Sequence, residues 1–196
     1  MPFQGKRIGF GITGSHHTFS RAFAQIENLV AKKAEVYPVV SFTVQHTDTK
    51  FGKAEDHLQR LEEITGRKVV KTMPDAEPFG PDLPLDCMII APLTGNSMAK
   101  LANGITDSPP LMAAKSTLRN EKPVVLGITT NDALGLNGKN LMQLLSTKNI
   151  YFIPFGQDSP FKKPNSLVAN LDLLEETVRL AMDSKQIQPI LIPYID

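Results

Sequence analysis

The sequence contains very little cysteine, no tryptophan and no excess of either charge. Cys87 is the one cysteine among 196 residues, which excludes an internal disulfide framework and a zinc site built from several thiolates. Lys and Arg number 21 and Asp and Glu 20, so the net charge of +1 gives no overall field that would attract nucleic acid or an anionic membrane. No stretch approaches the ~20 apolar residues that span a bilayer, and the N-terminus lacks the apolar core of a signal peptide. We therefore expect a cytoplasmic chain that has no metal site and binds its partners through a local site.

The size and composition favour a single domain over residues 1–196. Hydrophobic residues make up 41% of the chain and charged residues 21%, with a mean hydropathy of -0.12. These values are typical of a chain that buries one core and stays soluble. Several of the 15 prolines gather in residues 73–85 and in the tail 188–196. We expect the first of these segments to lack regular structure and to form a surface flap, and both to serve as contact elements.

Short apolar runs alternate with helical patterns along the chain. Runs typical of strands occupy residues 7–12, 36–42, 87–91, 124–128 and 151–155, with a further short strand over 68–71. Helical patterns cover residues 18–33, 54–65, 97–103, 111–119, 136–145 and 167–183, and Gly66 is the expected C-cap of the second helix. This alternation predicts an α/β fold with a doubly wound (flavodoxin-like or Rossmann-like), mostly parallel sheet of about five or six strands and helices on both faces.

Small polar residues follow four of the predicted strands. The segments are residues 13–18, 41–43, 92–97 and 129–132, and they carry hydroxyl, amide and glycine groups with few charges. In doubly wound sheets ligands bind outside the carboxyl ends of the strands. Hydroxyl groups and the free N–H groups of helix N-termini suit a phosphate and a polar heterocycle, because they donate hydrogen bonds without bulk. We therefore expect the ligand site along this edge.

A dinucleotide is one candidate for that ligand. Residues 9–14 contain the spacing G-x-G-x-x-G, but its first two glycines fall inside the predicted strand. The second strand ends with Ser41 and Thr43, where a dinucleotide site expects an acidic residue for the ribose. NAD is therefore disfavoured as the cofactor. The alternative for the first loop is an ordinary strand-to-helix turn with Thr18 or Ser20 as the N-cap.

The segment APLTGNSMAKLANGITD, residues 91–107, carries the most specific pattern. It resembles the flavin-containing cysteine decarboxylase superfamily, in which a Pro-Ala-Ser-Ala-Asn-Thr loop contacts flavin mononucleotide (FMN) and Lys, Ala, Gly and Asp recur along the next helix. This chain keeps Pro92, Asn96, Lys100, Ala102, Gly104 and Asp107, with Thr94, Gly95 and Ser97 at the varied positions. Residues 11–15 and Ser41 match the phosphate-side contacts of the family, so the resemblance spans residues 7–130.

The resemblance implies that FMN is the cofactor and that each strand-end loop helps to hold it. Residues 13–15 would line the ligand at the first helix, Ser41 and Thr43 would bond the phosphate or the ribityl chain, and the Asn96 amide would address the flavin. The implied set is Thr13, Gly14, Ser15, Ser41, Thr43, Pro92, Thr94, Gly95, Asn96, Ser97 and Thr130. The alternative for Asn96 is a capping role at the start of the helix 97–103, and the two roles are compatible.

The chain departs from the decarboxylases at the positions that act on a thiol substrate. Residues 78–86 contain no His, and residues 127–132 read GITTND where the family has a Pro-x-Met-Asn clamp. The lid with its reactive cysteine is missing, because Cys87 lies in a predicted strand as a buried, inert thiol. Decarboxylation of a thiol substrate is therefore disfavoured.

A closer likeness within the superfamily is to the B subunits of the dipicolinate synthases of endospore-forming bacteria. It rests on GITGSHHTF (residues 11–19), APLTGNSMAKLANGITDSP (91–109), GITTNDALGLNGKN (127–140) and IPFGQDSPFKKPNS (153–166). This likeness implies that the chain works with the nucleotide-binding A subunit of dipicolinate synthase. The pair would oxidise dihydrodipicolinate to dipicolinate in the mother-cell cytoplasm during sporulation. Removal of two hydrogens yields an aromatic pyridine ring, a reaction within the range of a flavin.

His16 and His17 are the catalytic candidates, because they flank the proposed flavin loop and one of them could remove a proton during aromatisation. The alternative is that both are exposed residues at the entry to the helix. Lys100, Lys162 and Lys163 are candidates for holding the substrate carboxylates. For these lysines we favour the alternatives, which are a structural pairing of Lys100 with Asp107 and a solvated loop around residues 162–163.

Two other functions stay open on the sequence. The chain could be an independent FMN-dependent decarboxylase or flavin prenyltransferase, or a flavin-free, non-catalytic partner of the A subunit. The resemblance also implies a homo-oligomer, a trimer or a dodecamer, with flavin sites between its copies.

Overall fold

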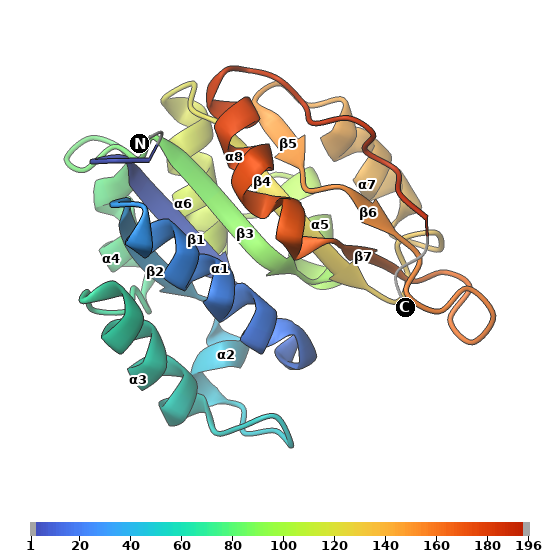
Figure 1. Ribbon diagram of the computed structural model, residues 1–196, viewed down its shortest axis with the longest axis horizontal. Coiled ribbons are helices and arrows are strands. Elements are labelled where there is room, and N and C mark those ends of the chain that lie inside the picture. Colours follow the sequence, from blue (N-terminus) through green and yellow to red (C-terminus); the bar gives the residue numbers. More distant parts are fainter. Residues whose placement is uncertain (1–2, 194–196) are drawn as a thin grey trace.

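A computed structural model describes residues 3–193 and contains a seven-stranded sheet between layers of helices (Figure 1). Five strands are parallel: β1 (Arg7–Ile12), β2 (Glu35–Val40), β3 (Cys87–Leu93), β4 (Val124–Thr130) and β5 (Ile150–Phe152). The short strands β6 (Phe155–Gly156) and β7 (Leu167–Ala169) are antiparallel. The order is β2-β1-β3-β4-β7-β6, with β5 paired to the first half of β4. The predicted doubly wound, mostly parallel sheet is thus confirmed.

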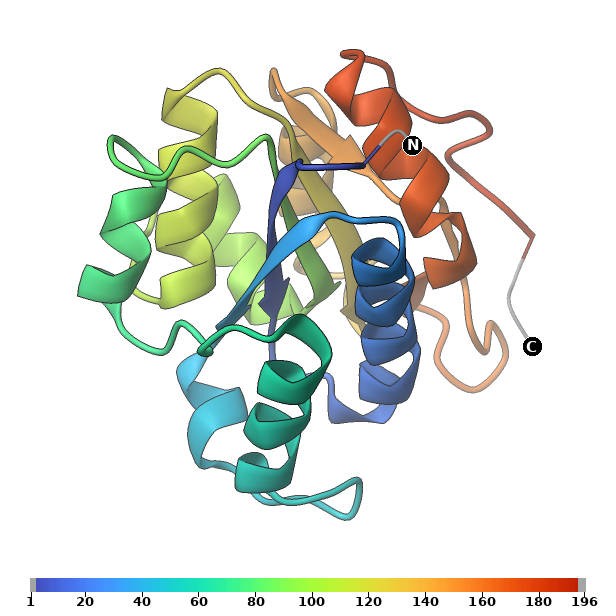
Figure 2. The ribbon, with the colours of Figure 1, turned by 60° about the vertical axis from the view of Figure 1, so that its left-hand side comes forward.

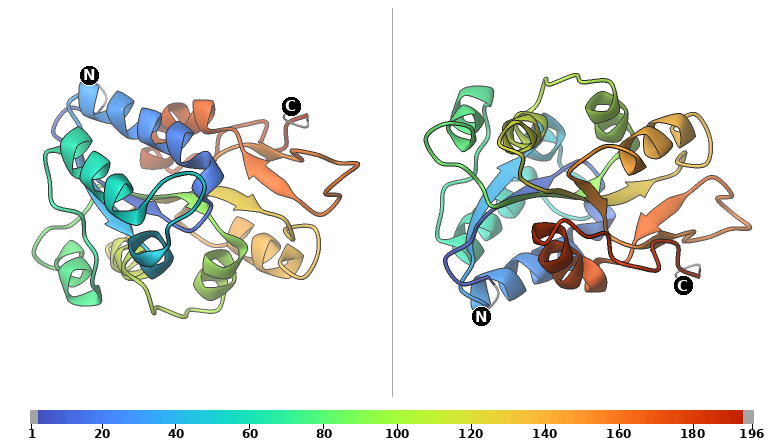
Figure 3. Two further views of the ribbon diagram at one scale, coloured as in Figure 1. Left: turned by 90° about the horizontal axis from the view of Figure 1, so that it is seen from below. Right: turned by 90° about the horizontal axis from the view of Figure 1, so that it is seen from above.

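Helices cover both faces of this sheet (Figure 3). The 3-10 turn η1 (His16–Thr18) leads into α1 (Phe19–Ala31), which lies on one face beside η3 (Leu171–Leu173) and α8 (Leu174–Met182). The opposite face carries α4 (Met73–Ala76), η2 (Glu77–Phe79), α5 (Gly95–Ala102), α6 (Pro109–Arg119) and α7 (Gly138–Leu145). Because both faces are covered, all seven residues of β3 are buried, as in other parallel sheets.

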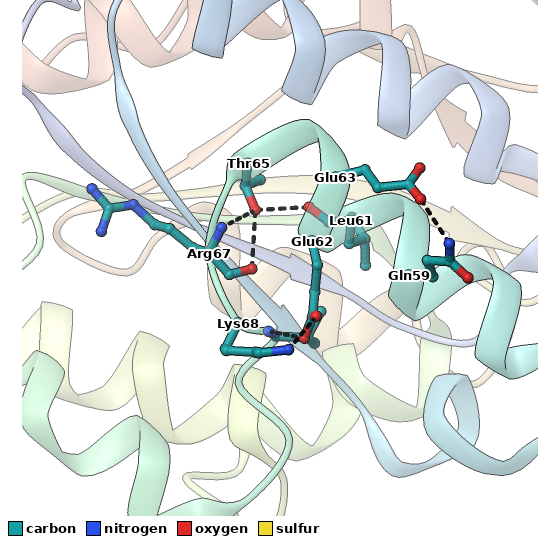
Figure 4. A network of polar contacts seen from close by, with 8 residues as sticks. Gln59, Leu61, Glu62, Glu63, Thr65, Arg67 and Lys68 are labelled. Carbon is teal, nitrogen blue, oxygen red and sulfur yellow. Dashed lines mark hydrogen bonds and ion pairs between the residues drawn. The ribbon is translucent and has the colours of Figure 1, made fainter.

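Two helices extend the structure beyond the edge strand β2. The short α2 (Phe42–His46) follows β2 directly, and α3 (Ala54–Thr65) packs against α1 (Figure 2). Gly66 ends α3 with a φ of 64°, in the left-handed region that favours glycine, so the expected C-cap is confirmed. Two residues beyond Gly66 bond back to Glu62 of α3: its carboxylate accepts from Lys68 Nζ at 2.8 Å and from the Val69 N–H at 3.2 Å (Figure 4). These bonds turn the chain back toward β2.

The first two glycines of the G-x-G-x-x-G spacing are packing residues inside β1. A Cβ on Gly9 would lie 2.5 Å from Met88 Sδ and 2.7 Å from Leu85 Cδ1. A Cβ on Gly11 would lie 2.9 Å from Met88 Cε and 3.2 Å from the Ile89 carbonyl oxygen. Both positions therefore have no space for a side chain, which accounts for the glycines without a dinucleotide.

The proline-rich segment 73–85 is more ordered than the sequence predicts. It contains α4 and η2, and Ala76, Phe79 and Leu85 are buried. Pro74 and Pro78 stand in the first turns of these short helices, where no backbone N–H is needed, and the Thr72 hydroxyl caps α4 by accepting from the Asp75 N–H. The prediction of a segment without regular structure was wrong, because the prolines fit helix starts.

The predicted helix over residues 167–183 is also wrong in its first half. Residues 167–169 form β7, which pairs with the end of β4 and with β6, and α8 begins only at Leu174. Several strand boundaries differ as well, and β3 and β4 each end two residues later than predicted. The strand predicted over 36–42 ends at Val40, the segment 68–71 contributes one bridge between Val39 and Val70, and the strand predicted over 151–155 is divided into β5 and β6. The tail 188–196 is described only to residue 193, where Leu191 bridges to Phe155; residues 194–196 lie outside the described part.

Candidate functional site

Two adjoining cavities lie where β1, β2, β3 and β4 end. The larger has a volume of about 350 Å³ and the smaller about 320 Å³, and both are lined by Thr94 and Asn96. The larger cavity is also lined by Ser15, His17, Gly95, Thr129, Thr130, Asn131, Asp132, Asp158, Ser166, Leu167 and Val168. The smaller cavity is also lined by Thr13, Gly14, Ser41, Phe42, Thr43, Ser97, Lys100, Asp107 and Ser108. The four strand-end segments named from the sequence therefore meet at one site.

The first loop is fixed to the loops that follow β3 and β4. Thr13 is 1% exposed; its hydroxyl donates to the Pro92 carbonyl at 2.8 Å and accepts from the Thr94 N–H at 2.9 Å. The Ser15 hydroxyl donates to the Thr129 carbonyl at 3.1 Å. Thr13 and Pro92 thus bind each other in this structure, next to the cis peptide bond that joins Ala91 to Pro92. Both residues hold the wall of the site together.

The smaller cavity contains an unpartnered polar atom. Ser41 is buried, and its Oγ forms no hydrogen bond with any residue of the described range. Ser41 is the N-cap of α2 without a capping side-chain bond, so its hydroxyl is free for a ligand. A Cβ on Gly14 would lie 3.0 Å from Thr43 Cγ2, which shows how closely the first loop approaches α2. Lys100 Nζ, in the same cavity, pairs with the Asp107 carboxylate at 2.7 Å.

The start of α5 forms the boundary between the cavities. Thr94 is the N-cap, and its hydroxyl accepts from the Ser97 N–H at 3.3 Å. The suggested capping role of Asn96 is therefore wrong, because the helix begins two residues earlier than the pattern predicts. Asn96 is exposed and its side chain makes no hydrogen bond with any other residue between 3 and 193, which leaves the amide free to face a ligand in either cavity.

The two histidines of the first loop face different surroundings. His16 is 9% exposed, its Nδ1 lies 3.1 Å from the Gly14 carbonyl, and its ring packs on Phe19 at 4.7 Å. His17 lines the larger cavity; partial burial, followed by the nearby Lys163 charge, holds the pKa of His17 below its usual value. An imidazole with a lowered pKa is neutral at neutral pH and can accept a proton. The alternative that both histidines are exposed is wrong, because His16 is buried, while His17 is an exposed residue of the cavity wall.

The remaining predicted residues lie outside the cavity linings. Lys162 and Lys163 are exposed in the loop between β6 and β7, and Lys163 Nζ pairs with Asp158, a lining residue, at 3.2 Å. Burial raises the pKa of the Cys87 thiol far above its usual range, which confirms the inert buried thiol. Within residues 3–193 no group of three His, Cys, Asp or Glu side chains is arranged to hold a metal ion. No helix in the same range has the length and apolar character needed to cross a membrane.

Several lining residues were missed by the sequence reasoning. Asn131 and Asp132 belong to the predicted strand-end segment 129–132, but they are absent from the set of cofactor residues that the resemblance implies. Leu167 and Val168 gave no such signal, because the pattern predicted a helix where β7 forms. Asp158 and Ser166 lie in the segment 153–166 that carries the resemblance, but the resemblance assigned them no role.

The site as a whole offers hydrogen-bond donors and little net charge. Ser41, Asn96 and the first N–H groups of α5 can bind an anionic group and a polar heterocycle, while both nearby lysines are already paired. This doubly wound fold with a strand-end site is that of a flavoprotein. Residues 2–176 match the family model described as Flavoprotein, and the chain belongs to that family.

The comparisons with individual proteins agree with this class. The chain is 63% identical over 189 residues to the B subunit of dipicolinate synthase from Bacillus subtilis (strain 168), covering 96% of this chain and 94% of that protein. The crystal structure of the dipicolinate synthase B subunit from Bacillus halodurans C matches with a TM-score of 0.92 and 58% identity over 100% of both chains. The FMN binding protein AtHal3 shares the fold, with a TM-score of 0.64 and 20% identity over 94% of this chain and 100% of that one.

Proposed function

We propose that this chain is the B subunit of a dipicolinate synthase, which acts with an A subunit to oxidise dihydrodipicolinate to dipicolinate in the mother cell of a sporulating bacterium. The observation that carries the proposal is the 63% identity to the Bacillus subtilis B subunit, which extends over almost the full length of both chains. The alignment covers 96% of the chain and so includes most of the residues that line the two cavities.

The proposed cofactor is FMN, and the residues of the site fit it. The free Ser41 hydroxyl in the smaller cavity suits the phosphate, and Thr43 and Gly14 stand beside it. The Asn96 amide, which lines both cavities, suits the ribityl chain or the ring. When bound, FMN supplies a two-electron acceptor for the hydride that aromatisation of the substrate ring releases.

His17 is the proposed base. Aromatisation removes a hydride and a proton from the ring, and the proton needs a neutral acceptor at the cavity wall. His17 lines the larger cavity and has a lowered pKa, so its imidazole is free to take that proton. His16 is kept in the proposal as a positioning residue of the loop, because its Nδ1 lies against the Gly14 carbonyl.

The substrate carries two carboxylates, which require donors. The N–H groups at the start of α5 provide some, and Lys163, held beside Asp158, is the proposed cationic partner from this chain. We assign Lys100 to its ion pair with Asp107 and Lys162 to solvent. The cavity therefore favours a small planar anion with polar edges.

The proposed assembly is a homo-oligomer, a trimer or a dodecamer, that binds the A subunit. Support comes from large apolar side chains left exposed on α7 and in the turn before it: Leu134 is 52% exposed, Leu136 88% and Met142 59%. Light scattering of the purified protein measures the number of copies. A monomer at micromolar concentration would refute this part of the proposal.

The deciding experiment mixes the two purified subunits with enzymatically generated dihydrodipicolinate and follows the ultraviolet absorbance of dipicolinate. We expect turnover only with both subunits and with FMN added, and a much lower rate with His17→Gln. Full turnover by the A subunit on its own would refute the catalytic role. A protein that takes up no FMN but is still needed by the A subunit would be the flavin-free partner instead. Carbon dioxide release without the A subunit would indicate a decarboxylase.

A further inference from the structure

The carboxylate of Asp132 lies at the meeting point of two helix N-termini. Its Oδ1 accepts a hydrogen bond from Thr130 Oγ1 at 2.5 Å, and its Oδ2 accepts from Asn137 Nδ2 at 2.7 Å. Asn137 is the N-cap of α7, and its own N–H donates to the Asp132 carbonyl at 3.2 Å. Asp132 thus fixes the end of β4 to the start of α7, while lining the larger cavity.

The same carboxylate also limits the start of α5. A Cβ on Gly95, the first residue of α5, would lie 2.6 Å from Thr130 Oγ1, 2.7 Å from Asp132 Oδ1 and 2.9 Å from Asn137 Nδ2. No real Cβ approaches polar atoms so closely, so these three side chains occupy the place of a side chain at residue 95. The first turn of α5, with Gly95 and Asn96, therefore rests directly on the Asp132 network.

A line of hydrogen-bonded amides continues from Asp132 to the far end of α5. Asn137 Oδ1 accepts from Asn140 Nδ2 at 2.8 Å, and Asn140 Oδ1 accepts from Asn103 Nδ2 at 3.2 Å. Asn137 and Asn140 are 8% and 5% exposed, so the bond between them is shielded from water, whereas Asn103 at the end of α5 is exposed. Asp132 is the charged end of this line, and α5 is held at both of its ends.

The charge of Asp132 also separates the two cavities by function. The N-termini of α5 and α7 carry partial positive charge, and Asp132 already supplies the anion they favour. Asp132 occupies the helix N-termini on the side of the larger cavity, whereas the unpartnered Ser41 hydroxyl lies in the smaller one, so the phosphate is assigned to the smaller cavity. A flavin that spans both cavities would place its ring on the Asp132 side.

We propose that Asp132 is a positioning residue for the ring side of the flavin site: through Thr130 and Asn137 it sets the first turn of α5, and with it the Asn96 amide. This inference rests on the proposed flavin cofactor. It assigns no role in proton transfer to Asp132, whose two oxygens are both engaged.

The test compares the affinities of FMN and riboflavin, which lacks the phosphate, for the wild type and Asp132→Ala, by quenching of flavin fluorescence. We expect Asp132→Ala to weaken both flavins equally by about tenfold, which corresponds to about 1.4 kcal/mol, and to change the shape of the visible absorption band of the bound flavin. Ser41→Ala is the contrasting variant and should weaken FMN alone. Asp172→Ala, an exposed aspartate on η3, is the matched control and should change neither flavin.

Asp132→Asn separates position from charge. An amide at residue 132 can still accept from Asn137 and can donate to the Thr130 hydroxyl, so this variant should keep most of the affinity that Asp132→Ala loses. It is also the usable variant if Asp132→Ala does not fold, since urea unfolding reports the folded fraction of each protein. The proposal then requires Asp132→Asn to keep the wild-type ratio of FMN to riboflavin affinity, with an altered flavin spectrum from the lost charge.

The outcomes distinguish this inference from the proposed function. Wild type that binds neither flavin refutes the cofactor and the positioning role together. Wild type that binds both, with a folded Asp132→Ala that also binds both unchanged, refutes the positioning role alone. A variant at residue 132 that loses affinity for FMN while keeping riboflavin would place Asp132 on the phosphate side and overturn the assignment.

Discussion

The Ser41 hydroxyl has no partner in the described part of the chain, so we expect Ser41→Ala to stabilise the free protein and to weaken its binding of FMN. The side chain is 8% exposed and its Oγ meets no donor or acceptor in the described part of the chain. A buried polar group without a partner costs about 1–3 kcal/mol. Ser41→Ala removes that group and loses no capping bond, because the hydroxyl does not cap α2. We therefore expect the free variant to be about 1 kcal/mol more stable, which raises Tm by roughly 2–4 °C in a chain of this size.

The same substitution should weaken FMN. A hydrogen bond from Ser41 to a phosphate dianion contributes about 1.5–3 kcal/mol, as for other bonds to charged groups. The variant should thus bind FMN roughly 10–150 times more weakly. Riboflavin, which has no phosphate, should bind the variant as it binds wild type.

Thermal melting of the free proteins and fluorescence titration with FMN give the two quantities. Ser146→Ala is the matched control, because the Ser146 hydroxyl is exposed and bonds only to carbonyls at the end of α7. It should change neither the Tm of the free protein nor FMN affinity by a measurable amount. The reasoning is refuted if Ser41→Ala melts below wild type and binds FMN with unchanged affinity, since the hydroxyl would then serve the fold and not the ligand.

Three further predictions concern the rest of the chain. Gly9→Ala should destabilise the protein by about 1–3 kcal/mol through overpacking, whereas Gly138→Ala, with its nearest neighbour 3.4 Å away, should not; urea unfolding measures both. Cys87 should resist a thiol reagent such as DTNB in the native protein and react only on unfolding, and rapid labelling without urea would contradict its burial. Burial is the main cause that lowers the pKa of His57 in the folded protein, and repulsion from His16 adds to it. As the pH falls below about 6.5, the unfolded chain therefore binds a proton before the folded protein does, and the free energy of unfolding decreases. His57→Gln should reduce that fall in Tm, and an equal fall would exclude His57 as its cause.

Much of the fold could be predicted because its signals are local. The strands β1, β3 and β4 are apolar runs bounded by turn residues, and helices α1 and α3 show an apolar stripe that the sheet buries. The strand-end rule then places residues 13–15, 41–43 and 92–97 at one edge of the sheet from the sequence alone. That rule needs only the direction of parallel strands, which the crossover helices fix.

The errors occur where distant parts of the chain decide the local structure. Leu167 stands at helical spacing from Leu171 and Leu174, so the sequence fits a helix as well as a strand, and only the end of β4 and the neighbouring β6 select the strand. The segment 73–85 is similar. Its prolines forbid a long helix but permit short ones, and Phe79 is held by packing on Tyr37 at 5.7 Å, which no local pattern encodes.

The role of Asp132 shows the same limit within the site. The sequence places Asp132 two residues after Thr130, the end of β4, but the structural role of its carboxylate depends on the N-termini of α5 and α7, which meet there. The near balance of charge in the whole sequence, a net +1, is also found at the site. Lys100 is neutralised by Asp107, Lys163 by Asp158, and the N-termini of α5 and α7 by Asp132. Both lysines near the described cavity walls are thus already paired, and recognition of the proposed phosphate falls to hydroxyl, amide and backbone N–H donors. Such donors impose direction as well as attraction, so a site of this kind discriminates by shape where a cluster of lysines would discriminate mainly by charge.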